Sequence, residues 1–445
     1  MSEPTPKVEK DFSALVDAQL PIAEGLVKAG KLVDALESLA TLEKQTRNSA
    51  DGVSNSRILI ANVKFCHQAG DWKLLQERVV LLSKKHGLLK AAVTKMIQEA
   101  MTLVDKTPNV ATKLELIETL RTVTDGKIFV EVERARVTRI LSKIREEEGK
   151  IVEACDILQE LQVETFGSME KREKTEFILE QMRLCLAKKD FPRVQIASRK
   201  ISLKFFEDPV QHDLKIRFYE LLIQFSTHEN QHLNTCKHYR HIYDTPRVKE
   251  NPKDLTNALQ NAVFFVILAQ YDNEQSDLIH RIYEDPNLGK LPLLKDLVKC
   301  FVTNELVRWP KIEEIYGPTL KATPAFDKSE GGQARLKALH ERVIEHNIRV
   351  IAKYYTRIST KRLTQLLDLS ANDAEEFLSK LVVSKTIHAK MDRPAGIINF
   401  VPRKSPNSVL NEWSSNINSL LGLISKTTHL IAKEEMVANI TLSKN

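Results

Sequence analysis

The segment from His228 to His238, HENQHLNTCKH, contains the residues of this chain that come nearest to a catalytic motif. His228, Glu229 and His232 form a His-Glu-x-x-His pattern, and His238 follows ten residues after the first histidine. On one continuous helix, two histidines four residues apart share a face and bind zinc, while the glutamate acts as a general base. The pattern therefore raises the hypothesis of a zinc hydrolase.

Three features of the sequence oppose that hypothesis. Thr235 stands where the extended zinc motif needs a glycine, and the next methionine is Met391, so the methionine turn of such enzymes is missing. The segment also falls where the repeat described below predicts a turn, and histidine and glutamate are ordinary turn residues. We predict that the motif arose by chance and that the chain has no bound metal, no cofactor and no enzymatic activity. The sequence also has neither a phosphate-binding glycine loop nor a Gly-x-Ser-x-Gly elbow.

The composition is that of a folded protein without a membrane span. The 445 residues are 42% hydrophobic and 28% charged, with a net charge of +7. The first residues, MSEPTPKVEKDFS, lack the apolar centre of a signal peptide, and the longest apolar run is too short to cross a bilayer. The cysteines are odd in number and widely separated, which indicates reduced thiols. We expect a soluble, unsecreted protein of the cytoplasm and nucleus.

Four similar strings indicate a helical repeat. GKLVDAL begins at Gly30, GDWKLLQ at Gly70, GKIVEAC at Gly149 and KDFPRVQ at Lys189, so a period of about forty residues fits if one copy near residue 110 has diverged. Glycine readily adopts the left-handed conformation that ends a helix and reverses the chain. The repeat predicts an all-α solenoid of stacked helical hairpins, similar to tetratricopeptide repeats, over residues 1–250.

The segment 251–402 is predicted to form a second domain. Its first part, 251–332, contains the apolar helix NAVFFVILAQY, which we interpret as a buried core helix. From residue 333 to 402 the pattern is helix, short strand, two helices and a β-hairpin, IHAKMDRPAGIINF, with Pro394 and Gly396 at its turn. Ser370 is suited to cap the second of the two helices, with Asp373 three residues on. This order of elements describes a winged helix.

Winged helices often bind DNA, but the charges here disfavour nucleic acid as a partner. The helix that would enter the major groove begins with Asn372, Asp373, Glu375 and Glu376, which would meet phosphates with negative charge. A basic stripe on the preceding helix leaves RNA or an acidic protein as an alternative partner. Its members are Arg335, Arg342, Arg349, Lys353 and Arg357.

The last segment, 403–445, carries a heptad of apolar residues. Successive members are separated by three and four residues, which is typical of a helix that packs in a coiled coil or bundle. Such a seam needs a partner, either the solenoid of the same chain or helices of other chains, and we favour other chains. Trp413 is a plausible anchor. The seam consists of Leu410, Trp413, Ile417, Leu420, Ile424, Thr427 and Ile431.

Helical hairpins that lead into a winged helix resemble the PCI domain, and several strings resemble one PCI family in particular. The strings KIFVEVERARVTRIL, ILQELQVETFGSME, RVIEHNIRVIAKYYTRI, KMDRPAGIINF and NEWSSNI are similar to those of the non-ATPase regulatory subunit 12 family of the 26S proteasome. This resemblance implies a non-catalytic scaffold in the regulatory particle lid, which supports ubiquitin-dependent protein degradation. Implied partners are other PCI-domain lid subunits and the lid deubiquitinating metalloprotease, in a hetero-oligomer without a membrane.

The resemblance also suggests how the wing and the last helix are used. It implies that the winged helix packs beside those of other PCI subunits, with the edge of the wing, including Ile398 and Phe400, pairing with protein. It also implies that the C-terminal helices of several lid subunits gather in one bundle. A PCI subunit of the COP9 signalosome, of the fourth-subunit type, is the alternative within the same class. A nucleic-acid-binding winged helix and a zinc hydrolase are the alternatives from other classes.

Overall fold

The computed structural model describes residues 12–85, 87, 89–401 and 405–442. It divides into an N-terminal unit, Met1–Asn230 with His238–Leu255, and a C-terminal unit, Gln231–Lys237 with Thr256–Asn445. Residues 1–11, on which the expectation of an unsecreted protein rests, lie outside the described residues. Residues 403, 404 and 443–445 of the predicted C-terminal segment also lie outside them. Among the described residues, no helix combines the length and apolar character needed to cross a membrane.

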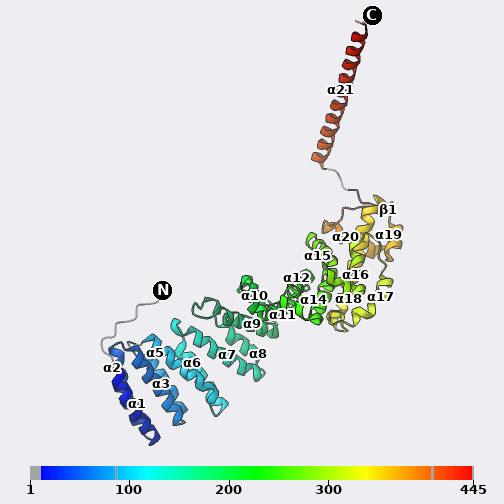
Figure 1. Ribbon diagram of the computed structural model, residues 1–445. Coiled ribbons are helices and arrows are strands. Elements are labelled where there is room, and N and C mark those ends of the chain that lie inside the picture. Colours follow the sequence, from blue (N-terminus) through cyan, green and yellow to red (C-terminus); the bar gives the residue numbers. More distant parts are fainter. Residues whose placement is uncertain (1–11, 86, 88, 402–404, 443–445) are drawn as a thin grey trace. The chain divides into compact units, whose positions relative to one another are not determined.

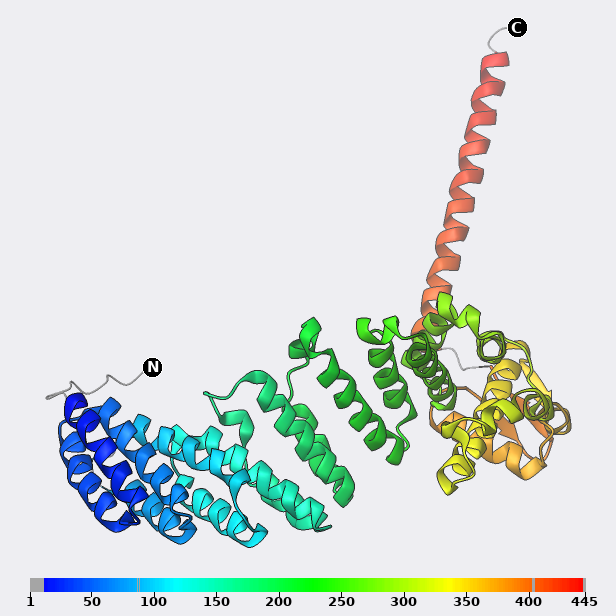
Figure 2. The same ribbon diagram turned by 60° about the horizontal axis from the view of Figure 1, so that its bottom comes forward.

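The N-terminal unit is built of antiparallel helical pairs that lie side by side (Figures 1 and 2). Short 3-10 turns at Val104–Lys106, Ile128–Val130, Val163–Thr165, Leu203–Glu207 and Pro209–Gln211 connect some of them. Its helices are α1 (Ser13–Lys28), α2 (Leu32–Asn48), α3 (Gly52–Gln68), α4 (Trp72–Lys84), α5 (Lys90–Leu103), α6 (Val110–Thr124), α7 (Glu131–Glu147), α8 (Ile151–Gln159), α9 (Lys171–Lys188), α10 (Phe191–Arg199), α11 (His212–His228), α13 (Pro246–Glu250) and the latter part of α12 (His232–Tyr243).

The four turns predicted from the repeat all adopt the left-handed conformation. The φ angles are +81° at Gly30, +72° at Gly70, +81° at Gly149 and +64° at Lys189. In each turn the amide of the next residue returns to a carbonyl five residues earlier, as when the amide of Asp190 donates to the carbonyl of Cys185 at 2.9 Å. The missing copy is the α5–α6 connection, where a 3-10 turn replaces the tight reversal. The structure confirms the helical repeat.

The core of the N-terminal unit forms where equivalent helices stack on their neighbours. Ala35, Leu75, Ala154 and Val194, which share one offset in the repeat, are all buried with at most 1% of their surface exposed. One continuous apolar cluster extends from α2 to α7. Each hairpin alone would leave its apolar stripe in water, so stacking on the next hairpin is what stabilises the array.

The C-terminal unit combines a small helical layer with a three-stranded sheet (Figure 1). Its 3-10 turns are Pro286–Lys290 and Pro324–Phe326. Besides the start of α12 and most of α14, which crosses from the first unit, it contains α15 (Asn273–Tyr283), α16 (Pro292–Val302), α17 (Trp309–Lys321), α18 (Glu330–Tyr354), β1 (Arg357–Ser359), α19 (Thr360–Leu367), α20 (Ala371–Val383), β2 (Lys390–Asp392), β3 (Ile397–Asn399) and α21 (Pro406–Leu442). Helix α14 (Pro252–Leu268) holds the apolar run 262–268, which is buried as predicted.

The segment from α18 to β3 is a winged helix, as predicted. The antiparallel sheet has the order β1-β3-β2, and the central residue Ile398 pairs with Ile358 on one side and with Met391 on the other. Ser370 caps α20 by accepting a hydrogen bond from the amide of Asp373 at 3.2 Å. The core between the sheet and α18, α19 and α20 is wholly apolar, including Ile348, Leu363 and Leu378.

The structure places Ile398 and Phe400, which were predicted to lie at the partner-facing edge of the wing, inside the winged helix. Ile398 is fully buried and Phe400 is 6% exposed, and both belong to the core of the winged helix. The physical reason is the strand order, because β3 is the central strand, and Ile398 on it and Phe400 just after it pack in one cluster with residues of α18, α19 and α20. The sheet edges belong to β1 and β2, and on β2 the exposed residues are the charged Lys390 and Asp392.

Candidate interaction surfaces

The His-Glu-x-x-His motif does not lie on one helix. His228 is the last residue of α11, Glu229 caps it, and His232 is the first residue of α12. Between them Asn230 has a φ of +57°, so the chain reverses inside the motif, as the repeat predicts. The geometry that places two histidines four residues apart on one helical face is therefore absent.

The three histidines of the motif contact different aromatic rings. His228 stacks on Phe191 with 3.8 Å between ring centroids, while His232 lies 6.0 Å from the ring of Phe265. His238 lies 5.8 Å from Tyr219. Burial lowers the pKa of His232 to about 4, helped by the nearby positive charges of Arg335 and Arg342. Within the described part of the chain, no three His, Cys, Asp or Glu side chains are grouped to hold a metal ion.

Three arginines of the basic stripe make contacts within the C-terminal unit. The Nε of Arg335 donates to the carbonyl of Ala325, and Arg342 pairs with Glu345 at 2.7 Å. The guanidinium of Arg349 lies 3.8 Å from the ring centroid of Tyr271, and burial lowers the pKa of this arginine to about 10. Lys353 and Arg357 alone are exposed. The stripe is therefore not a continuous surface for RNA phosphates.

The helix that would read DNA also presents acidic side chains. Asp373 and Glu376 are exposed on α20, and Glu376 pairs with Lys380 at 2.7 Å. Glu375 forms an ion pair with Arg393 in the turn of the wing, so this cation is also partly neutralised. Carboxylates thus accompany the cations on α20 and in the wing, which disfavours DNA binding.

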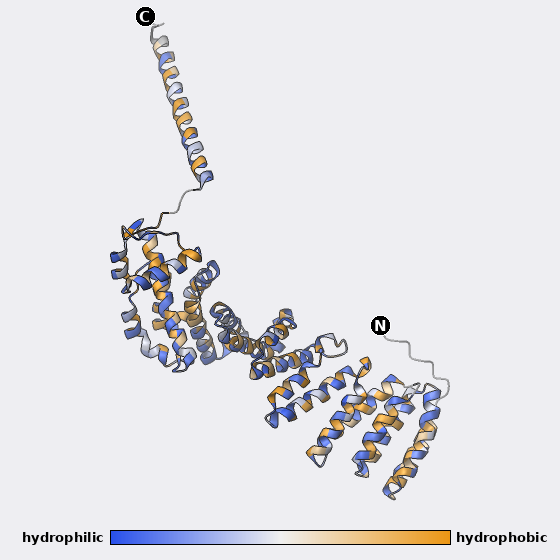
Figure 3. Cartoon of the chain, turned by 180° about the vertical axis from the view of Figure 1, so that it is seen from behind, coloured by the Kyte–Doolittle hydropathy of each residue, from blue (hydrophilic) through white to orange (hydrophobic). Residues whose placement is uncertain are grey.

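Helix α21 exposes more large apolar side chains than any other helix in the described chain. Every side chain described from Pro406 to Ala438 is exposed, and Trp413 keeps 63% of its surface accessible. Figure 3 shows hydrophobic residues recurring along the whole length of this helix. Soluble proteins rarely leave so many large apolar side chains in water unless another chain covers them. The large apolar members of the predicted seam, all exposed, are Leu410, Trp413, Ile417, Leu420, Ile424 and Ile431.

The heptad analysis missed a second row of apolar residues on α21. Leu423, Leu430 and Val437 follow one another at intervals of seven, and Leu421 lies beside Leu420. All four are exposed. These positions flank the seam, so the middle of the helix is apolar over a wider arc than contact with one partner helix requires. The same seven-residue spacing in the sequence was the signal that would have found them.

Three family models match successive parts of the chain. Residues 34–251 match the N-terminal region shared by PSMD12 and CSN4, and residues 302–401 match the PCI domain. The match to residues 34–251 fits both a proteasome subunit and a signalosome subunit. Residues 407–439, which form most of α21, match the C-terminal domain of 26S proteasome regulatory subunit RPN5. The chain belongs to the RPN5 family.

Related RPN5 proteins from distant organisms match nearly the whole chain. The chain is 45% identical over 434 residues to 26S proteasome non-ATPase regulatory subunit 12 of Dictyostelium discoideum, covering 98% of this chain and 96% of the relative. It is 43% identical over 440 residues to RPN5 of Saccharomyces cerevisiae, covering 98% and 99%. It is 48% identical over 410 residues to rpn501 of Schizosaccharomyces pombe, covering 92% and 93%. The family resemblance drawn from the sequence strings is confirmed.

Proposed function

We propose that this RPN5-family chain is a structural subunit of the proteasome regulatory particle lid that holds neighbouring subunits in place. The chain is a non-catalytic PCI subunit, and its contribution to ubiquitin-dependent protein degradation is positional. Its neighbours would be other PCI-domain lid subunits and the lid deubiquitinating metalloprotease. The single observation that carries the proposal is the exposed apolar length of α21, the same segment that matches the RPN5 C-terminal domain.

Helix α21 would act by packing among helices of more than one neighbour. A seam flanked by a second apolar row suits a bundle of several helices better than a pair. Burial of apolar side chains is the main favourable term in such assembly, and a large aromatic side chain near the seam is a typical hot spot. The seam of α21 provides the contact, and Trp413 provides its anchor.

The winged helix would provide a second contact through the outer edges of β1 and β2. Unpaired backbone amides and carbonyls on these edges can be satisfied by a neighbouring chain. Because β2 carries Lys390 and Asp392 on its exposed face, a partner strand there would need complementary charges. We assign the solenoid of residues 1–250, the PCI domain of residues 251–402 and the C-terminal helix to separate contacts. The site of action would be the cytoplasm and nucleus.

The proposal is tested by replacing the anchor of α21. Trp413→Ala should weaken incorporation into the regulatory particle by ~2 kcal/mol or more, which is a loss of about 30-fold in affinity. Ser415→Ala is the matched control, because Ser415 lies on the opposite face of the same helix. The measurement is the fraction of tagged subunit that elutes with the assembled particle. Equal incorporation of both variants would contradict the proposed role of α21.

The identity of the co-purifying chains tests the complex itself. Native purification of the tagged full-length protein should recover proteasome subunits, with the deubiquitinating metalloprotease among them. Recovery of signalosome subunits instead would overturn the assignment to the lid. Recovery of a folded monomer alone would overturn the structural role.

A further inference from the structure

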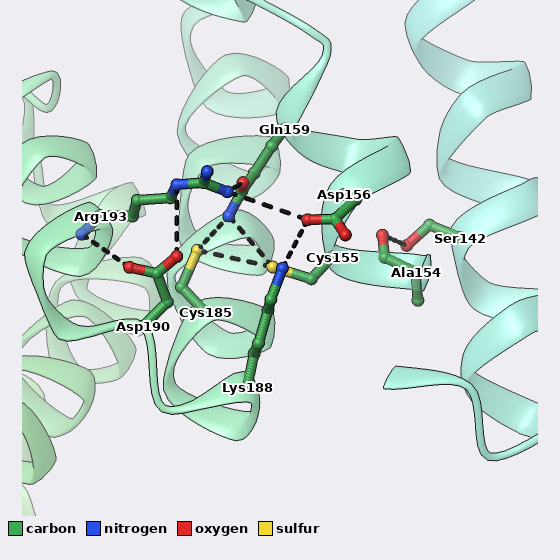
Figure 4. A network of polar contacts seen from close by, with 9 residues as sticks. All are labelled: Ser142, Ala154, Cys155, Asp156, Gln159, Cys185, Lys188, Asp190 and Arg193. Carbon is green, nitrogen blue, oxygen red and sulfur yellow. Dashed lines mark hydrogen bonds and ion pairs between the residues drawn. The ribbon is translucent and has the colours of Figure 1, made fainter. Parts of the chain in front are cut away.

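Two thiols of the N-terminal unit lie opposite each other across the α8–α9 interface. The sulfur atoms of Cys155 on α8 and Cys185 on α9 are 3.8 Å apart, and Figure 4 shows both pointing toward one another. Both side chains are buried, with 1% and 2% of their surface exposed. A disulfide requires about 2.05 Å between the sulfurs, so the two side chains would have to rotate toward each other to form the bond.

The amide of Gln159 is held so that it donates to both sulfurs. Its Nε2 lies 2.9 Å from the sulfur of Cys185 and 3.1 Å from that of Cys155. Its Oε1 accepts a hydrogen bond from Arg193, which fixes the orientation of the amide because an arginine can only donate. The N–H groups of Gln159 are therefore directed at the thiols, where they stabilise a negative sulfur.

The two cysteines are not chemically equivalent. A hydrogen bond from the Cys155 thiol, supported by the Gln159 amide and the charge of Arg193, lowers the pKa of Cys185 although burial acts in the opposite direction. The same interaction and burial raise the pKa of Cys155. Cys185 is therefore the thiol of the pair that loses its proton more readily, and Cys155 is its partner thiol.

The charged groups around the pair are largely neutralised by one another. Asp156 of α8 pairs with Lys188 of α9 at 2.6 Å and lies 3.8 Å from Arg193 of α10. Asp190, the cap of α10, lies 3.2 Å from Arg193. The carboxylates are thus engaged by cations, which limits their repulsion of a thiolate at Cys185.

One thiol of the pair, that of Cys185, borders a cavity. A cavity of about 440 Å³ is lined by Gln159, Gln181, Cys185, Arg193 and Ala197 among others. Hydrogen peroxide is close to water in size, so it can enter where a larger reagent cannot. The position of Cys185 at this cavity makes its sulfur the one that meets the oxidant first.

We propose that Cys155 and Cys185 form an oxidative modification site, at which hydrogen peroxide converts the two thiols into an intramolecular disulfide that joins α8 to α9. The Cys185 thiolate attacks one peroxide oxygen, the O–O bond breaks, and hydroxide leaves to give a sulfenic acid. The sulfur of Cys155 then attacks that of Cys185, the S–O bond breaks, and the proton of Cys155 leaves with the hydroxyl group as water. In total, two thiols and one peroxide yield one disulfide and two waters. The site is independent of the proposed assembly role.

The experiment compares the thiols of the purified full-length chain. After limited peroxide treatment, free thiols are alkylated and the chain is digested without reduction for mass spectrometry. We expect the linked 155–185 peptides to form while Cys300 stays alkylated. Cys300 is the most exposed of the five cysteines, but burial raises its pKa. Oxidation of Cys300 before the pair, or absence of the linked peptides, would overturn the proposal.

Two variants test the roles within the pair. Cys155→Ser removes the second thiol, so Cys185 should accumulate as a sulfenic acid that a 1,3-dione reagent labels, whereas the wild-type chain should label little. Gln159→Met removes the amide donor and should slow oxidation at pH 7 about fivefold to tenfold, with the rate recovering near pH 9 as more thiolate forms. Cys300→Ser is the control and should react at the wild-type rate. No label on Cys155→Ser, or an unchanged rate and pH profile for Gln159→Met, would contradict the mechanism.

Discussion

Gly332 is the glycine of the C-terminal unit whose surroundings leave least space for a side chain. It is buried in the first turn of α18, and a β-carbon built on it would lie 2.0 Å from the carbonyl oxygen of Asp327. Gly331, its neighbour in the same turn, has no atom closer than 3.8 Å to such a carbon. A side chain at position 332 would collide with the preceding loop, which packs directly against the helix.

The first prediction compares these two glycines. Gly332→Ala should lower the free energy of unfolding by ~1–3 kcal/mol, because the loop at Asp327 has to move. Gly331→Ala should be neutral or raise it by up to ~1 kcal/mol, since alanine favours helix over glycine. Denaturant unfolding of both full-length variants is the measurement. Equal stabilities would show that the loop yields without cost.

His346 gives the C-terminal unit a dependence on pH. It is 4% exposed, and its Nε2 lies 3.2 Å from the carbonyl oxygen of Glu305. Burial, together with the charge of Arg349, lowers its pKa to about 4. The folded chain therefore binds a proton less readily than the unfolded chain.

The second prediction follows from the lowered pKa of His346 in the folded chain. As pH falls from about 6.5 to about 4, the unfolded chain takes up a proton at this position first, so stability falls by up to ~3 kcal/mol and then levels off. His346→Gln, which does not titrate, should lose this part of the slope while keeping a polar side chain. Unfolding measured at several pH values checks it. The same slope in wild type and variant would assign the dependence to other groups.

At the scale of the element, the left-handed turns decide where each hairpin reverses. Three of the four turns predicted from the repeat use glycine, but the residue that caps the C-terminus of α9 is Lys189, whose φ is +64°. A residue with a β-carbon is strained in this conformation by ~1 kcal/mol or more. The turn is nevertheless formed, because the packing of α9 and α10 requires it.

The third prediction relieves this strain. Lys189→Gly should raise the free energy of unfolding by ~0.5–1 kcal/mol, the release of strain being partly offset by the greater freedom of glycine in the unfolded chain. Lys189→Ala is the control, because it removes the same side chain but keeps the β-carbon, and it should bring no gain. Thermal or denaturant unfolding distinguishes the two. A gain from alanine equal to that from glycine would place the effect in the lysine charge.

The elements show what could be predicted from the sequence and what could not. The turn at Lys189 was predicted without a glycine, because its offset from the apolar positions matched the other copies. The alternation of apolar and polar residues around Ile398 and Phe400 correctly predicted a hairpin. The same alternation is expected whether the apolar face packs on helices of its own chain or on another chain, so the sequence could not distinguish the two. Cys155 and Cys185 lie 30 residues apart on different helices, so only the packing of α8 on α9 could reveal them.

At the scale of the whole molecule, α21 differs from every other long helix in burying none of its described side chains through Ala438. The core of the winged helix is complete without it, since that cluster is formed by residues between Ile344 and Phe400. The stability of the rest of the chain should therefore not depend on the last helix.

The fourth prediction removes α21. A chain ending at Val401 should unfold within about 2 °C of the full-length protein, because no apolar core is opened, and should show less self-association. Its incorporation into the regulatory particle should be strongly reduced. Calorimetry and sedimentation check the first two expectations, and native purification checks the third. A large loss of stability would mean that α21 packs on its own chain in solution.

Because the apolar side chains of α21 are exposed in the free chain, the amount of usable protein should depend on the amounts of the chains that cover this helix. A newly made copy exposes the apolar side chains of the 37-residue helix α21 to water until other chains cover them. Such surfaces promote aggregation and attract quality-control factors. Excess synthesis of this subunit alone would consequently yield little additional usable protein. Balanced production of the assembling chains would be needed to raise its level.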